Sequence, residues 1–93
     1  MLEDIQKKLE KALDPNFIQL RDDSGKHAGH AGWREGELTH LHIVVASKKF
    51  EGLSKVKRHQ HIYKLLAEEI EAGLHAVSMK VYSAEEILEF KSK

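Results

Sequence analysis

The feature that most constrains the fold of this chain is a long helical segment placed between two segments with strand periodicity. Residues 38–47 and 75–82 alternate apolar and polar side chains, whereas residues 54–72 carry apolar side chains at helical spacing. Ser54 fits the N-cap of this helix, and Gly73 is suited to end it. A helix between two strands permits a right-handed crossover, so the sequence predicts that these two strands pair in parallel.

The same periodicities predict which side chains face a core. We expect each strand to present one apolar face, and the helix to present a single apolar stripe. The expected faces of the first of these strands are Leu41, Ile43 and Val45 on one side and His40, His42 and Val44 on the other. The expected apolar positions elsewhere are Val56, Tyr63, Leu66 and Ile70 on the helix, widened by Ile62 and Leu65, and Val77, Met79 and Val81 on the last strand.

The N-terminal part of the chain adds one helix and one strand. Residues 2–13 predict an amphipathic helix, which should end at Leu13–Asp14 because Pro15 disfavours helical geometry in the residue before it. Residues 17–21 alternate and predict a short strand that can form an antiparallel hairpin with the strand at 38–47.

The C-terminal part adds a last helix. Ser83 to Glu86 fits a capping box, so we expect this helix to run from Ala84 to about Phe90. The predicted order is therefore α-β-β-α-β-α, in one domain over residues 1–93. This is an α+β sandwich of two layers, in which helices cover one face of a three-stranded mixed sheet.

The charge balance and the absence of cysteine limit the classes of function. The chain has 15 basic and 15 acidic side chains, seven histidines and no cysteine. The balanced charge gives no global attraction to nucleic acid. Without thiolates, the chain alone cannot build an iron–sulfur centre or a cysteine-type zinc site. Imidazole nitrogen is the metal ligand that it can offer, and further ligands have to come from elsewhere.

Missing motifs exclude several further classes of function. No apolar run approaches the roughly 18 residues of a membrane span, and the first residues do not resemble a signal peptide, so we expect no membrane contact. The absence of cysteine fits a cytoplasmic location. The sequence also lacks a cysteine nucleophile, a Gly-x-Ser-x-Gly elbow and a glycine-rich phosphate loop ending in Gly-Lys. We therefore expect a protein that is not an enzyme.

A glycine-rich segment at 22–37 separates the first two strands. A loop of this length in a small domain is more often functional or disordered than decorative. His27 and His30 lie three residues apart within it, and either imidazole can turn toward a metal or a partner. Loop histidines without a role are an equally good interpretation, because a pair of histidines is a weak metal signal.

The remaining histidines differ in their placement. His40 and His42 share a strand face and could bind zinc, although polar side chains on the outer face of a strand need no special role, and we favour that interpretation. His59 and His61 lie two apart on a helix and do not face each other. His75 begins a strand directly after the helix-ending glycine, at the rim of the sheet, where a structural hydrogen bond is the alternative to a ligand role.

Several short motifs in a fixed order resemble the BolA family. The resemblance extends from about Leu2 to Phe90. It implies the fold of that family, which is similar to a class II KH domain. The motifs are Thr39-His40-Leu41, Phe50-x-Gly52, Arg58-His59, Leu65-Leu66-Ala67-Glu68-Glu69, His75-Ala76-Val77 and the loop His-Ala-Gly-His-Ala-Gly.

This resemblance implies a partner and a shared cofactor. BolA proteins bind monothiol glutaredoxins, and the heterodimer can hold a [2Fe–2S] cluster. Thiolates come from the glutaredoxin cysteine and from glutathione, while the BolA protein supplies the histidine before its third strand and a residue of its loop. In this sequence, the resemblance assigns the first ligand to His75 and the second to either His27 or His30. The distance from the first strand favours His27. The loop is longer here than in the shortest family members, so His30 can also take this place. No cluster is expected in the isolated chain, and binding should weaken at acidic pH because imidazole ligates only when neutral.

The resemblance also implies a second function, the regulation of transcription by DNA contact. The Gly-x-x-Gly loop of KH domains is replaced here by Glu51-Gly52-Leu53-Ser54. A third interpretation is a partner-binding module whose histidines never contact iron, and both rank below the glutaredoxin adaptor. The candidate phosphate contacts are the basic residues around the start of the long helix, Lys48, Lys49, Lys55, Lys57 and Arg58.

Overall fold

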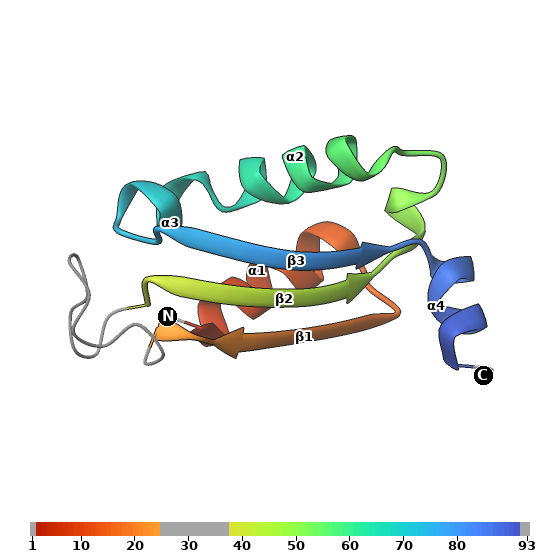
Figure 1. Cartoon of the computed structure of the whole chain (residues 1–93), viewed down its shortest axis with the longest axis horizontal. Coiled ribbons are helices and arrows are strands. Elements are labelled where there is room, and N and C mark those ends of the chain that lie inside the picture. The colour runs from red at the N-terminus through yellow and green to blue at the C-terminus, as the bar shows by residue number, and fades with distance from the viewer. Residues whose placement is uncertain (1, 25–37, 92–93) are drawn as a thin grey trace.

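The computed structural model describes residues 2–24 and 38–91, and it confirms an α+β fold (Figure 1). Two features were not predicted: a 3₁₀ helix after the second strand, and the division of the long helix into two. The elements are α1 (Leu2–Leu13), β1 (Phe17–Asp22), β2 (His40–Ala46), the 3₁₀ helix η2 (Lys48–Phe50), α2 (Lys55–Leu65), α3 (Ala67–Glu71), β3 (Ala76–Tyr82) and α4 (Ala84–Lys91).

The three strands form one mixed sheet in the order β1-β2-β3. β1 pairs with β2 in antiparallel orientation, and β2 pairs with β3 in parallel orientation, as the crossover helix predicted. The strand predicted at 38–47 is shorter, because β2 begins at His40. The N–H of Thr39 bonds to the Ser24 hydroxyl at 2.8 Å, outside the pairing with β1.

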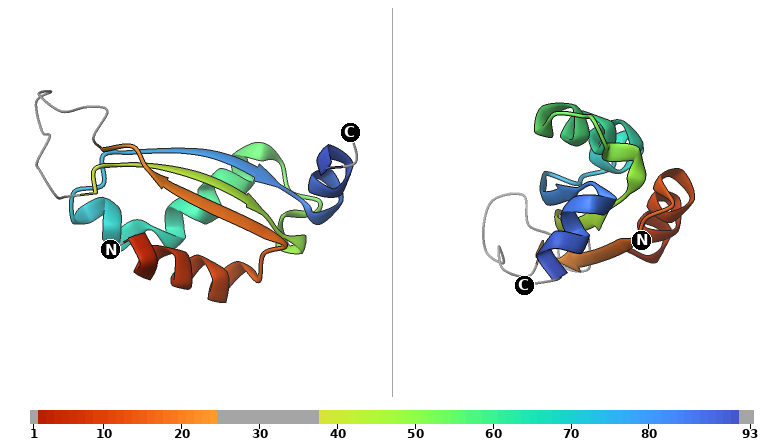
Figure 2. Two further views of the ribbon diagram at one scale, coloured as in Figure 1. Left: turned by 90° about the horizontal axis from the view of Figure 1, so that it is seen from below. Right: turned by 90° about the vertical axis from the view of Figure 1, so that its right-hand side faces the viewer.

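Helices α1 and α2 lie on the same side of the sheet, as expected for two layers (Figure 2). The apolar face of β2, formed by Leu41, Ile43 and Val45, is at most 2% exposed. Each large aliphatic side chain removed from water contributes roughly 1.5–3 kcal/mol before the entropy cost. The core is completed by Ile5, Leu9, Leu13, Leu38, Phe50, Ile62, Leu66, Leu74 and Val81.

The single helix predicted for residues 54–72 is wrong, because the helix is interrupted at Leu66. The Leu66 backbone leaves helical geometry with φ −99° and ψ 11°. Lys8 of α1 donates from its Nζ to the Leu65 carbonyl at 2.9 Å and to the Glu69 carboxylate at 2.7 Å. In an unbroken helix that carbonyl accepts the N–H four residues on, so a side chain inserted there accounts for the break.

The predicted apolar stripe of the long helix is also partly wrong. Ile62 and Leu66 are fully buried, but Val56 and Tyr63 are 65% and 43% exposed. The buried face of α2 instead carries Arg58, which is only 8% exposed. Val56, Tyr63 and Ile70, which follow one another at intervals of seven residues, therefore lie on the outer side of the helical segment, with Ile70 39% exposed.

Burial of Arg58 is tolerated because the nitrogen atoms of its guanidinium group donate to hydrogen-bond acceptors. Its Nε donates to the Leu53 carbonyl at 3.0 Å, and its Nη1 donates to the Val81 carbonyl at 3.1 Å. Nη1 also donates to the Glu86 carboxylate at 2.6 Å, which forms an ion pair between α2 and α4. This arrangement satisfies the donors that burial would otherwise leave unpaired.

Two helix ends follow the predicted signals. Gly73 has φ +125°, and its N–H bonds to the Ile70 carbonyl while the Leu74 N–H bonds to the Glu69 carbonyl, which is the Schellman pattern. Ser83 and Glu86 form a reciprocal capping box: the Ser83 N–H donates to the Glu86 carboxylate at 2.7 Å, and the Glu86 N–H donates to the Ser83 hydroxyl at 3.3 Å.

The Arg58–Glu86 ion pair should make stability depend on pH. Hydrogen bonds from Arg58 and from the Ser83 N–H lower the pKa of Glu86 from its ordinary value of 4.5. A carboxyl group with a lowered pKa stabilises the fold above its unfolded pKa, and this stabilisation is lost as the pH falls through the lower folded value. Glu86→Gln keeps an acceptor for the capping box and should cost about 1–2 kcal/mol at pH 7 in urea denaturation, since Glu86 is half exposed.

The matched control is Glu85→Gln, an exposed neighbour in the same turn, which should change the free energy of unfolding by less than about 0.5 kcal/mol. The difference between the native protein and Glu86→Gln should begin to shrink as the pH falls through the ordinary value of 4.5, and it should disappear once the pH is below the lowered pKa of Glu86 in the folded protein. A difference that stays constant down to pH 2 would contradict the ion pair as its cause.

Candidate functional site

His75 lies at the end of the sheet where β3 begins. Its side chain is exposed. Its backbone N–H donates to the Thr39 carbonyl at 2.8 Å, and the N–H of Ala76 donates to the same oxygen at 3.1 Å. The peptide that carries His75 is therefore fixed to the start of β2, while its imidazole faces solvent, where a partner can reach it.

Ser24 fixes the same end of the sheet from the other side. Its hydroxyl accepts N–H bonds from Thr39 at 2.8 Å and from His40 at 3.1 Å, and Ser24 is 5% exposed. The adjacent Asp23 N–H donates to the His40 carbonyl at 2.9 Å. We call the group of Ser24, Thr39, His40 and His75 the Thr39 junction; it holds β1, β2 and β3 together where the glycine-rich segment leaves and rejoins the sheet (Figure 1).

The two loop histidines predicted as ligands, His27 and His30, lie outside the described residues. The described residues fix the two ends from which that segment departs, Ser24 and Leu38, and both are buried at the Thr39 junction. Whether His27 or His30 approaches His75 stays a prediction.

His40, which the sequence analysis considered only together with His42, is a neighbour of His75. The two rings lie with their centroids 6.4 Å apart and their planes inclined by 51°. The cause is the strand register, which pairs His40 of β2 with Ala76 of β3. Parallel pairing was predicted, but its register was not, and only the register brings the two imidazoles together.

The other histidines take separate positions. The Nδ1 atom of His42 lies 2.6 Å from the Ser78 hydroxyl on the open face of the sheet. His61 packs edge-on against Phe50, with ring centroids 6.1 Å apart. Within residues 2–24 and 38–91, no group of three or more His, Asp or Glu side chains could hold a metal ion. A metal held through His75 therefore needs ligands from the glycine-rich segment, a second molecule or solvent.

The predicted basic patch is only partly formed. Lys48, Lys49, Lys55 and Lys57 are exposed around the start of α2, although the Lys49 Nζ donates to the Ala12 carbonyl at 2.6 Å. The guanidinium group of Arg58 does not join them, because it is buried and bonded to Leu53, Val81 and Glu86.

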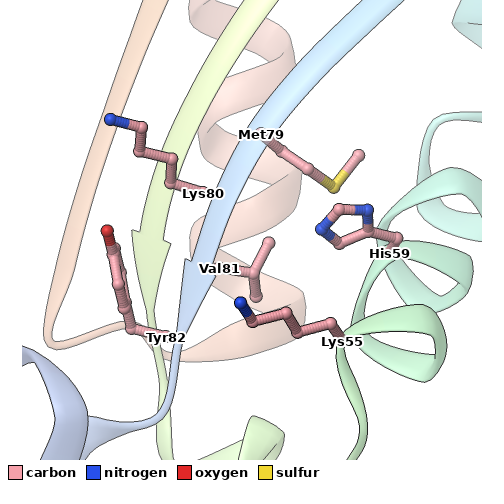
Figure 3. A pocket seen from close by; sticks show the side chains of 6 residues that line it. All are labelled: Lys55, His59, Met79, Lys80, Val81 and Tyr82. Carbon is pink, nitrogen blue, oxygen red and sulfur yellow. The ribbon is translucent and has the colours of Figure 1, made fainter.

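A shallow pocket adjoins this patch, between the start of α2 and the outer edge of β3. Its volume is about 320 Å³. Figure 3 shows Met79, His59 and Lys55 on one side of β3, whereas Lys80 and Tyr82 point to the other side. The pocket combines a thioether, an imidazole and an ammonium group, a mixture that accepts flat or anionic groups without specifying one.

None of the helices among the described residues has the length and apolar character needed to cross a bilayer. The described residues thus form a small α+β domain with an exposed imidazole at the rim of its mixed sheet. Comparison with known proteins identifies its family. The family model of BolA-like proteins matches residues 9–86, and the chain belongs to this family.

Known relatives support this assignment. The chloroplastic protein BOLA1 of Arabidopsis thaliana is 46% identical over 77 residues, which cover 81% of this chain and 48% of that protein. A solved structure of BolA1 from the same plant covers 92% of this chain and 94% of the solved chain with a TM-score of 0.82 and 40% identity. The fold class predicted from the sequence is confirmed by this likeness, and the label class II KH-like stays a prediction.

Two further relatives carry informative names. The SufE-like protein 1, chloroplastic/mitochondrial, of Arabidopsis thaliana is 44% identical over 88 residues, covering 89% of this chain but 24% of that protein. The DNA-binding transcriptional regulator BolA of Haemophilus influenzae is 34% identical over 82 residues, covering 88% of this chain and 76% of that protein. The chain thus spans about half of the length of BOLA1 and a quarter of the SufE-like protein.

The Thr39 junction can be tested through Ser24→Ala. Removing the hydroxyl leaves the N–H groups of Thr39 and His40 without their acceptor, and Thr39 is 2% exposed. We expect a loss of about 1–3 kcal/mol in urea denaturation, with faster hydrogen exchange at these two amides. Ser78→Ala, on an exposed position of β3, is the matched control and should leave both quantities nearly unchanged. Unchanged exchange at residues 39 and 40 in Ser24→Ala would show that the hydroxyl does not hold this end of the sheet.

Proposed function

We propose that this protein is an adaptor, not an enzyme, that pairs with a monothiol glutaredoxin and shares a [2Fe–2S] cluster with it in iron–sulfur trafficking or iron regulation. The observation that carries the proposal is the position of His75. Its imidazole is exposed at the rim of the sheet, while its N–H is bonded to Thr39. A ligand that must bind metal across an interface has to combine an accessible side chain with a fixed backbone.

The chemistry of the available ligands fits such a cluster. The chain has no thiolate of its own, so iron ligation by cysteine has to come from the glutaredoxin and glutathione. Histidines replace two of the four cysteine ligands in known [2Fe–2S] centres and raise the reduction potential. A cluster with two imidazole ligands is easier to reduce and, because the ligands must be neutral, easier to release in acid.

The second imidazole is assigned to the loop, to His27 or to His30. His27 follows Ser24 by three residues in the sequence, and a fully extended chain spans at most about 3.5 Å per residue, so three residues can bridge at most roughly 10 Å from Ser24. Because Ser24 and His75 both bond to Thr39, this reach is sufficient for a shared cluster. His30 has about twice that reach.

Reconstitution tests this function. The protein is mixed with a monothiol glutaredoxin, glutathione, iron and sulfide, and visible absorption and circular dichroism are recorded. We expect a spectrum different from that of the glutaredoxin alone, lost in His75→Ala and in one of His27→Ala and His30→Ala. The matched control is His42→Ala, which removes an imidazole of β2 that bonds to Ser78 and should leave the spectrum intact.

An unaltered glutaredoxin spectrum with the native protein would refute cluster sharing and favour a cluster-free partner role. A native spectrum that survives His75→Ala would refute the ligand assignment. The cytoplasmic location stays a prediction, and two relatives carry chloroplastic or mitochondrial names.

A second candidate function, DNA-binding regulation, has one specific observation in its favour. The relative from Haemophilus influenzae is named a DNA-binding transcriptional regulator. In this chain, four exposed lysines surround the start of α2 beside the pocket at the edge of β3: Lys48, Lys49, Lys55 and Lys57. Arg58 is not part of this proposed surface, because it is buried against Glu86.

Salt dependence tests the DNA-binding function. If the lysines contact phosphates, affinity for duplex DNA should fall as salt rises, and Lys55→Ala/Lys57→Ala should reduce the slope of log K against log[salt] by about 2. The matched control is Lys7→Ala/Lys64→Ala, which removes two exposed lysines that are not among the four of this patch. Binding that is undetectable at about 50 mM salt, or equally weakened by both double variants, would refute the patch as a phosphate-binding surface.

A further inference from the structure

We propose that the outer edge of β3 is a docking surface for an extended, acidic segment of a partner protein, which adds to the sheet as a further strand. β3 is the last strand in the order β1-β2-β3, so the described residues place a strand on only one of its two edges. An edge strand without a neighbour is a template for another strand. This surface goes beyond the proposed functions, because its recognition depends on the β3 backbone and the adjoining flank of α2 and does not involve His75.

Alternate residues of β3 turn their backbone groups away from β2. The Ala76 N–H donates to the Thr39 carbonyl at 3.1 Å, and the Tyr82 carbonyl accepts the Ser47 N–H at 3.1 Å. The N–H and C=O of one strand residue point to the same side, and this side alternates along the strand. The even-numbered residues therefore face β2, and the residues that face outward are Val77, Met79 and Val81.

The described residues use only part of this outer edge. Nη1 of Arg58 donates to the Val81 carbonyl at 3.1 Å. The Val77 carbonyl is approached only by the Tyr63 hydroxyl at 3.5 Å, well beyond the usual O–H···O distance of about 2.7–2.8 Å, and Tyr63 is 43% exposed. The N–H groups of Val77, Met79 and Val81 have no acceptor among the described residues. The edge therefore keeps donors and the Met79 carbonyl for pairing with a further strand.

A groove beside this edge leaves room for such a strand. The shallow pocket of about 320 Å³ is lined by residues 79–82 of β3 and by Lys55 and His59 of α2 (Figure 3). Tyr63, one turn after His59 on the same flank of α2, extends the groove along β3, because its hydroxyl lies next to the strand. A strand that adds to β3 here places every second side chain against α2.

The charges around the groove favour an acidic occupant. Lys55 lies on the helix side of β3, whereas Lys80 points to the opposite side (Figure 3). Neither lysine forms an ion pair with another described residue. Successive side chains of a strand point to opposite faces, so carboxylates at adjoining positions of an added strand can reach one lysine each.

The same charges disfavour a second copy of this chain as the occupant. Pairing of two β3 edges would gather the Lys80 side chains of both copies on one face, and like charges on neighbouring strands are destabilising. A lysine on an edge strand is a common protection against pairing with identical edges. It does not protect against an acidic segment, which supplies the opposite charge.

Titration of a peptide into the ¹⁵N-labelled native chain, followed by NMR, tests the docking surface. The probe is the acetylated and amidated peptide Gly-Glu-Val-Glu-Val-Glu-Gly. We expect shifts and slower hydrogen exchange at the outward-facing amides of Val77, Met79 and Val81, because each gains an acceptor. The same peptide with lysine in place of each glutamate should bind at least about tenfold more weakly.

Charge reversal identifies the surface. Lys55→Glu and Lys80→Glu, both at exposed positions, should each weaken binding of the acidic peptide about three- to tenfold. The matched control is Lys64→Glu, also exposed, which follows Lys55 by nine residues and so lies on the opposite flank of α2. It should change the affinity less than about twofold. His75→Ala should leave peptide binding unchanged, and Lys80→Glu should leave the glutaredoxin spectrum unchanged, so the two proposals fail separately.

Four results would overturn the docking surface. These are no amide shift with about 1 mM peptide, equal binding of the lysine peptide, equal weakening by Lys64→Glu, or shifts without slower exchange at residues 77, 79 and 81. Duplex DNA that shifts these three amides, where the acidic peptide does not, would assign the groove to nucleic acid and also refute the proposal.

Discussion

The arrangement of this protein depends on the hydrogen bonds made at Thr39. Its carbonyl accepts the N–H groups of His75 and Ala76, and its N–H is bonded to the hydroxyl of Ser24. One buried residue thereby joins the ends of all three strands, although β1 and β3 have no direct pairing. A small sheet with two edge strands needs such a connection, because each edge is otherwise held by one partner only. The exposed histidine is a consequence of this connection, since the strand that carries it starts at the bonded carbonyl.

The opposite end of the sheet is held by a different kind of interaction. There Arg58 of α2 bonds to the Val81 carbonyl and to Glu86 of α4, so a buried cation joins two helices and the edge strand. Because Arg58 is committed to this structural role, the basic surface around the start of α2 consists of four exposed lysines, of which Lys49 bonds to the Ala12 carbonyl. The exposed histidine and the basic surface therefore lie at opposite ends of the sheet, and each is the basis of one of the two proposed functions.

Much of the fold follows from local sequence signals, since capping and periodicity act within a few residues. The Ser83–Glu86 capping box and the Gly73 turn were predicted because each depends only on neighbouring residues. The interruption at Leu66 was not predictable in this way, because it is caused by Lys8, 57 residues away in the sequence. The burial of Arg58 escaped prediction for the same reason: its acceptors come from β3 and α4, and periodicity alone ranks a charged side chain as exposed.

The candidate site was also predictable from the sequence only where it depends on neighbouring residues. The exposed position of His75 followed from its place after a helix-ending glycine, but its pairing with His40 required the register of two strands, which the alternation of side chains does not set. The described part of the chain offers two imidazoles and no third ligand close by. In the proposed complex, His75 offers an imidazole from the sheet, and the thiolates of the glutaredoxin and of glutathione would supply the further iron ligands. In that proposal, cluster binding and partner binding strengthen each other by the same free energy, so the cluster would be held only while the partner is present.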